Sequence, residues 1–389
     1  MKLLLIKIGK AWSVIRRDGV FRGGKRVLKA FLGLFKGVQP GDILFITNGV
    51  GDSARYRTKS IAETLEQQGV ATSVTVQDNP FLVSYAHDFS VFVFHRVIFT
   101  EKVRKFIDHI KEHAGTIVFE ADDLVYDPEY LTHMDYFQKM NALERKLYEN
   151  GVGGEILADP YVKVCTTSTE YLAHKLREKR KQVFVLKNRL TEKDVTDAET
   201  ARQSVRKDPS VIRIAYFSGT PSHNKDFATI APVVMRLLAK YPELRLVLAG
   251  PLDVDDALNK YSAQIERVAF APRAEHFRNI ANVDINLAPL EIGNPFCESK
   301  SELKWFEAGI VGVPTVAAAT EPFRQAITDG VDGFVAASET EWEDRLERLI
   351  KSKEEREKMG EQARQAVLSR YTTKGVSDTE YVNYLRGKL

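Results

Sequence analysis

Short apolar runs alternate with helical stretches along most of the chain, and this alternation limits the fold more than any other feature. In the first half the runs lie at 42–47, 91–94, 116–120, 162–165 and 183–186. In the second half they lie at 211–217, 244–249, 268–270, 284–288 and 314–318. Apolar runs of this length, separated by helices, predict buried parallel strands and therefore an α/β protein.

The chain length predicts two domains, because 389 residues exceed what one ordinary hydrophobic core holds. Residues 191–210 are charged and polar and carry almost no large apolar side chains, so we expect them to be an interdomain linker. The expected domains are then 38–190 and 211–370, followed by a tail at 371–389 with a last helix.

The net charge of +3 conceals a strongly basic N-terminal segment. Residues 1–37 contain ten Lys or Arg and one acid, Asp18, which gives +9 and leaves −6 for the rest of the chain. Lys7 and Lys10 interrupt the first apolar run, which argues against a signal peptide, and no run is long enough to span a bilayer.

Within this basic segment, residues 22–36 have the pattern of an amphipathic helix. At about 100° per residue, one arc carries apolar side chains and the opposite arc carries basic ones. The apolar residues are Val27, Leu28, Phe31, Leu34 and Phe35, and the basic ones are Arg22, Lys25, Arg26, Lys29 and Lys36. Such a helix can lie on an anionic membrane or pack on the first domain, and the sequence leaves both open.

The stretch 297–319 combines a helix with a buried strand. Leu303, Phe306 and Ile310 fall near one helix face, and Gly312 followed by Pro314 ends the helix. Glu307 lies on this otherwise apolar element. A carboxylate at the mouth of a parallel sheet can accept hydrogen bonds from the diol of a ribose, although a solvated surface role explains the same residue.

The segment from Glu307 to Pro314, EAGIVGVP, resembles the E-A-x-x-x-G-x-P motif of retaining glycosyltransferases of family 4. The resemblance implies the GT-B fold, in which two Rossmann-like domains face a cleft and a C-terminal helix crosses back. It also implies a nucleotide-diphosphate sugar as donor, retention of anomeric configuration, and neither a cofactor nor a metal. The second Glu of the family motif is replaced by Ser299, with Glu298 one place away, and Lys300, Ser301 and Lys304 resemble a branch found in bacterial surface-polysaccharide synthesis.

A second stretch resembles the diphosphate-binding loop of the same family. Gly219 and Thr220 follow the run 211–217, and Lys225 starts the next helix, where backbone amides and a cation can hold a phosphate. By resemblance, Arg273 lies near the nucleotide base, where it could stack on the base or merely be exposed. The expected donor-binding residues are Gly219, Thr220, Lys225, Arg273, Lys300, Ser301, Lys304 and Glu307.

Polar clusters also follow three strands of the first half, where a crevice would open. They contain Asp52, Ser53, Arg55, Arg57, His95, Arg96, Asp122 and Asp123. By resemblance these residues form the acceptor side, although an ordinary capped helix with surface arginines explains the cluster from Asp52 to Arg57 equally well. Asp122 and Asp123 are interpreted as contacts to acceptor hydroxyls or helix caps, with a metal site as the less favoured alternative. Lys225, Lys300, Glu307 and His95 are the predicted catalytic residues. A satisfied core histidine would explain His95 equally well, and a capped turn with a surface lysine would explain Lys225.

The predicted function is transfer of a sugar to a glycan or lipid-linked saccharide in polysaccharide biosynthesis, without a nucleic-acid partner. The expected location is the cytoplasm, with possible attachment to the inner face of the plasma membrane through residues 1–37. Cys165 and Cys297 offer no disulfide framework, which fits a reducing compartment. Two alternatives remain: an epimerase or phosphorolytic enzyme on the same fold, and a non-catalytic sugar-nucleotide-binding subunit.

Overall fold

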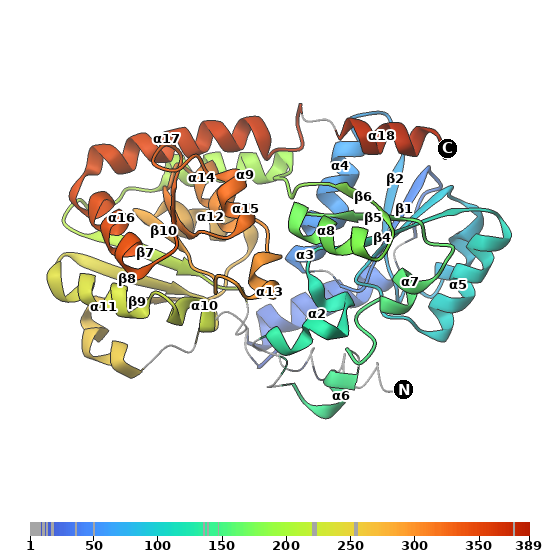
Figure 1. Ribbon diagram of the computed structural model, residues 1–389, viewed down its shortest axis with the longest axis horizontal. Coiled ribbons are helices and arrows are strands. Elements are labelled where there is room, and N and C mark those ends of the chain that lie inside the picture. Colours follow the sequence, from blue (N-terminus) through green and yellow to red (C-terminus); the bar gives the residue numbers. More distant parts are fainter. Residues whose placement is uncertain are drawn as a thin grey trace. The chain divides into compact units, whose positions relative to one another are not determined.

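The computed structural model describes residues 9, 12, 15–16, 19–35, 37–49, 51–134, 137, 140–146, 148–219, 224–252, 256–375 and 378–389. The chain forms two compact units, each built on its own sheet (Figure 1). Unit 1 comprises the described parts of Met1–Thr132, Phe137–Lys187 and Ser377–Leu389. Unit 2 comprises those of His133–Tyr136 and Asn188–Val376.

The sheet of unit 1 has six parallel strands in the order β2-β1-β3-β4-β5-β6. The strands are β1 (Ile43–Thr47), β2 (Thr72–Val76), β3 (Val91–His95), β4 (Thr116–Ala121), β5 (Val164–Thr167) and β6 (Gln182–Val185). The chain leaves β1 toward β2 and then crosses to β3 on the other side. This reversal opens a crevice at the carboxyl ends of β1 and β3, where ligands bind in open α/β sheets.

Helices connect the strands of unit 1, and a helix from the end of the chain joins them. They include α2 (Val20–Leu34), α3 (Asp52–Ala54), a π-helical turn at Arg55–Ser60, α4 (Ile61–Glu66), α5 (Glu101–Glu112), α8 (Glu170–Glu178) and α18 (Thr379–Arg386). Tyr381, Val382 and Leu385 of α18 are buried in one core cluster with Ile61 and Leu65 of α4. The last helix therefore completes the core of the first unit, as the fold prediction required.

The sheet of unit 2 repeats the design, with six parallel strands in the order β12-β11-β10-β7-β8-β9. The strands are β7 (Ile212–Phe217), β8 (Leu244–Ala249), β9 (Ile265–Val268), β10 (Ile285–Ala288), β11 (Thr315–Ala318) and β12 (Phe334–Ala336). Here the reversal lies between β7 and β10. Side chains that follow these two strands are thus placed together at the carboxyl edge.

The helices of unit 2 cover both faces of its sheet (Figure 1). They are α9 (Glu192–Ser204), α10 (Asn224–Ala228), α11 (Ala231–Lys240), α12 (Arg273–Ala281), α13 (Pro295–Glu298), α14 (Leu303–Ile310), α15 (Glu321–Ala326), α16 (Glu339–Lys351) and α17 (Lys353–Arg370). Because β7 leads to β8 in one direction and β10 leads to β11 in the other, right-handed crossovers place α11 and α14 on opposite faces.

The expected linker at 191–210 is corrected, because most of it is a helix. Thr191 and Asp194 form a capping box at the start of α9, which packs on α12 within unit 2. The chain passes from unit 1 to unit 2 between Lys187 and Asn188 instead. Charged composition misled the prediction, since α9 buries only the small side chains of Ala198 and Ala201 and the carboxylate of Asp194.

Among the described helices, none combines the length and the apolar character that crossing a bilayer requires. The expected amphipathic helix in the basic N-terminal segment is present as α2, although residues 1–8, 10–11, 13–14, 17–18 and 36 lie outside the described part.

Candidate functional site

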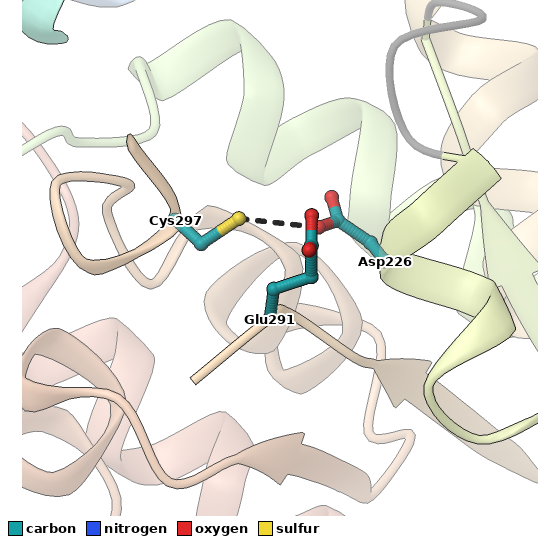
Figure 2. Close-up of side chains that lie close together, drawn as sticks. All are labelled: Asp226, Glu291 and Cys297. Atoms are coloured by element: carbon teal, nitrogen blue, oxygen red, sulfur yellow. Dashed lines mark hydrogen bonds between the residues drawn. The ribbon is translucent and has the colours of Figure 1, made fainter. Parts of the chain in front are cut away.

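The buried carboxylate of Asp226, in unit 2, holds together polar groups that follow β7 and β10. Asp226, on α10, accepts hydrogen bonds from the Cys297 thiol at 3.2 Å and from the Lys300 ammonium at 3.0 Å. Figure 2 shows Asp226, Glu291 and Cys297 turned toward one another. The chain thus brings α10, the loop after β10 and the segment before α14 to one place.

The Asp226, Glu291 and Cys297 side chains also offer three potential metal-ligand atoms within 4.8 Å of one another. Burial and the nearby Asp226 carboxylate raise the pKa of Cys297 to about 12, so the sulfur is a thiol at neutral pH. The Lys300 ammonium already supplies positive charge to the same carboxylate. Asp226 thus joins the Cys297 thiol and the Lys300 ammonium in one hydrogen-bonded network that holds Lys300 in place.

Two cations lie close together at the start of α14. Burial, together with the Lys300 charge, lowers the pKa of Lys304, and the Lys304 ammonium lies 5.5 Å from the centre of the Tyr216 ring. The Asp226 carboxylate beside Lys300, together with Glu307, partly offsets the repulsion between the two ammonium groups and acts to raise the pKa of Lys304. Lys300 and Lys304 thus bring together two positive charges of the kind that attracts a diphosphate.

Glu307 lies one helical turn further along α14 and is nearly buried. Its carboxylate forms an ion pair with Arg273, and its second oxygen lies 3.3 Å from His276 Nε2. A carboxylate can accept hydrogen bonds from the hydroxyls of a ribose, and this is the role predicted for Glu307. Arg273 and His276 fix the orientation in which it would do so.

Arg273 has a different environment from the one expected. Its guanidinium donates to Asp194 at 2.9 Å and to Glu307, and it lies over the Phe277 ring, 4.4 Å from the ring centre. These contacts leave Arg273 largely buried, so the alternative that it is merely exposed is wrong, whereas its stacking on a nucleotide base stays a prediction. In this arrangement it orients Glu307.

The position of the second family Glu is not a ligand-binding one in this chain. Ser299 is fully buried and donates to the Phe296 carbonyl at 2.8 Å. Glu298 accepts from the backbone amides of Gly293 and Glu321 and so joins two loops. Ser301 accepts from Asn188 Nδ2 at 2.8 Å, close to the other residues of this segment.

The loop after β7 is only partly described. Thr220 lies outside the described residues, Gly219 has open space where a side chain would stand, and Lys225 is exposed on α10. Gly250 is the glycine that this region requires, because its φ is +91° and an added Cβ would meet the Ser218 carbonyl at 1.9 Å. Gly250 lets the loops after β7 and β8 touch.

In unit 1, polar side chains converge where β1 and β3 end. His95 is buried, with Thr47 Oγ1 2.9 Å from its Nδ1 and Ser53 Oγ 2.9 Å from its Nε2. Ser53 also donates to Asp122 at 2.5 Å. His95, Ser53 and Asp122 therefore form one group, assembled from the ends of β1, β3 and β4.

Arg96 binds both carboxylates of the acidic run. It donates to Asp122 at 2.6 Å and to Asp123, and its backbone has φ +49°, which is unusual for a long side chain. Burial opposes ionisation of Asp122, but Arg96 and His95 outweigh it and hold the pKa of Asp122 well below its usual value. Burial mainly raises the pKa of Asp123, which also accepts from the Val125 amide.

Two arginines predicted for the acceptor side differ in exposure. Arg57 is fully buried and donates to Glu120 at 2.7 Å and to the Leu186 carbonyl at 2.5 Å. The prediction that Arg57 contacts an acceptor is therefore corrected, because its guanidinium is enclosed in the core. Arg55 is partly exposed and pairs with Asp52 at 3.5 Å, so both stay accessible.

Comparisons with known proteins agree with this architecture. Residues 232–379 match a family model described as glycosyl transferase-like. The chain is similar to Anabaena Alr3699/HepE in complex with UDP and glucose, with TM-score 0.59 and 15% identity over 90% of this chain and 100% of that one. The fold is GT-B.

Two further GT-B structures are similar to the chain. Sucrose-phosphate synthase from Thermosynechococcus elongatus has TM-score 0.59 and 13% identity, covering 90% of this chain and 98% of that one. WaaG, a glycosyltransferase involved in lipopolysaccharide biosynthesis, has TM-score 0.54 and 14% identity, covering 89% and 100%. No curated protein sequence matches the chain.

Within the GT-B frame, three residues of the site had not been singled out from the sequence: Asp226, His276 and Asp194. Asp226 directly follows Lys225, which had been selected from the sequence. Only the fold shows that Asp226 forms an ion pair with Lys300. The capping pattern of Thr191 and Asp194 is visible in the sequence and could have predicted the start of α9. It could not have predicted the hydrogen bond that Arg273 donates to Asp194.

Proposed function

We propose that this protein is a glycosyltransferase that moves a sugar from a nucleotide-diphosphate donor to a glycan or lipid-linked saccharide, with retention, in polysaccharide biosynthesis. The observation that carries the proposal is the pair of Lys300 and Lys304 beside Glu307, at the carboxyl edge of a GT-B sheet. The family match over 232–379 supports it, as do the neighbours: HepE was solved with UDP-glucose and WaaG acts in lipopolysaccharide biosynthesis.

The chemistry follows from the charge that develops on the leaving group. Breaking the bond between the sugar and the diphosphate places negative charge on the phosphate oxygens, and fixed cations there lower the barrier. Lys300, held by Asp226, and Lys304 would supply that charge without a metal, while Glu307 holds the ribose. Retention is carried over from the resemblance of the segment from Glu307 to Pro314.

Unit 1 would bind the acceptor. Ser53 and Asp122 offer a hydrogen-bonding edge at the β1 and β4 ends, with the buried His95 behind Ser53, and Arg96 holds Asp122 ionised. An ionised carboxylate accepts hydrogen bonds from sugar hydroxyls, which suits a saccharide acceptor. The partly exposed Arg55 and Asp52 extend the same edge.

A donor panel tests the proposal. We expect one class of nucleotide sugar to raise the melting temperature, since a ligand at 100 times its Kd adds about 2.7 kcal/mol of stability. With a saccharide acceptor, that donor should give a product whose anomeric proton coupling in NMR shows retention. Lys300→Ala should lower kcat/KM about ten- to hundredfold, the worth of one charge-assisted hydrogen bond.

The matched control is Lys353→Ala, which removes a lysine whose side chain is 71% exposed, on α17. It should leave turnover unchanged. Donor binding without turnover on any lipid-linked or free saccharide would contradict the proposal and favour a non-catalytic subunit, whereas an inverted product would contradict retention alone.

A further inference from the structure

Helix α2 carries an apolar face that the rest of unit 1 does not cover. Six large apolar side chains on it or directly after it are more than half exposed: Val20 (75%), Phe21 (93%), Leu28 (57%), Phe31 (54%), Leu32 (61%) and Phe35 (53%). Phe31 and Phe35 contact each other edge to face, with ring centres 5.4 Å apart. Single exposed apolar residues are ordinary, but a contiguous group of this kind marks an interaction surface.

The helix contacts its own unit by a different edge. Gly23 is buried and Val27 and Leu34 are half-buried, and at about 100° per residue these three fall on one narrow arc. The exposed apolar residues fall on the neighbouring arc. Packing on unit 1 therefore accounts for one side of α2 and leaves its widest apolar side facing water.

Beyond the exposed apolar arc, the wheel places the basic positions. Lys25, which is exposed, begins this arc, and Arg22, Arg26 and Lys29 follow it in the sequence pattern. The whole segment 1–37 carries a net charge of +9. An apolar arc bordered by lysines and arginines matches the boundary of a bilayer, with acyl chains below and phosphates beside it.

We propose that the exposed face of α2 is a docking surface for a bilayer that contains anionic lipids. A second copy of the chain fits the surface less well, because joining two such helices would bring two segments of +9 together. The sequence left a membrane role and packing on the domain equally open, and the exposure of Phe21, Leu28 and Leu32 favours the membrane. The proposal does not depend on the proposed transferase activity.

Vesicle flotation with the full-length protein tests the proposal. The protein should float with vesicles of phosphatidylcholine that contain phosphatidylglycerol, and should bind vesicles of phosphatidylcholine alone much more weakly. Phe31→Ser combined with Phe35→Ser should weaken binding at least about tenfold, because two rings no longer enter the bilayer. Lys25→Glu should weaken it about fivefold or more, as expected for a charge near an anionic surface.

The matched control is Phe81→Ser, which removes an equally exposed ring (53%) from another part of unit 1. It should bind vesicles as the unchanged protein does, and thermal melting should show that all variants are folded. Equal binding to neutral and anionic vesicles, or full binding by the double Phe variant, would overturn the proposal. So would a dimer that the double variant converts to monomers while neither form binds vesicles.

Discussion

At the scale of single residues, Lys304 gives the donor site a pH dependence. Burial and the Lys300 charge lower its pKa, so Lys304 loses its proton at a lower pH than an ordinary lysine. A bound diphosphate favours the charged form. Donor affinity should therefore be full below the pKa of Lys304 in the free protein and fall as pH rises through it, by up to tenfold per pH unit.

Titration calorimetry at several pH values measures this fall, and Lys304→Arg is its control. Arginine keeps its charge throughout the pH range, so the donor affinity of the variant should fall less as the pH rises. Any titration of the nucleotide itself affects both proteins equally and cancels in the comparison. Identical pH profiles for the two proteins would show that Lys304 does not face the diphosphate.

Individual residues also show what the sequence could reveal about the site. The sequence alone identified the motif around Glu307 and the two cations Lys300 and Lys304. The structure places these three residues close together. Two of the partners that orient them, His276 and Asp226, were not found, and Arg273 was found without its contact to Glu307. These residues act through contacts between helices distant in sequence, which no local pattern encodes.

At the scale of elements, the π-helical turn after α3 depends on one enclosed ion pair. Arg57 and Glu120 are both fully buried, and Thr166 also donates to Glu120. Arg57→Met should destabilise unit 1 by about 3–5 kcal/mol, because it leaves a buried carboxylate without its cation. Chemical denaturation measures this, and adding Glu120→Leu should restore much of the loss.

The control for that pair lies on α5, where Arg104 binds Glu101 at the surface. Arg104→Met should cost no more than about 1 kcal/mol, as exposed ion pairs do. Equal losses in both variants would mean that the Arg57 pair is solvated, contrary to its burial.

The helices and strands also differ in how well the sequence predicted them. Continuous apolar runs predicted β1, β3, β4, β7 and β8 closely, since a strand buried on both faces must be apolar throughout. The edge strand β2, with the sequence TSVTV, is only partly buried and was missed. Helix α9 was missed because it buries alanines, and its capping box was the one local signal that marked it.

At the scale of the whole molecule, the chain ends by returning to the unit in which it began. Leu385 of α18 is fully buried in the core of unit 1, together with Tyr381 and Val382, while the preceding residues to 376 belong to unit 2. Leu385→Ala should destabilise unit 1 by about 2–5 kcal/mol through the cavity that it leaves.

Hydrogen exchange followed by mass spectrometry locates this effect. Peptides from β1 and β5 should exchange faster in Leu385→Ala, whereas peptides from β7 and β8 should keep their rates, because each unit has its own core. Leu389→Ala removes the same side chain at a position that is 48% exposed and should change neither set. Faster exchange in β7 and β8 as well would mean that the two units unfold as one cooperative body, so that α18 stabilises the entire chain rather than the unit it enters.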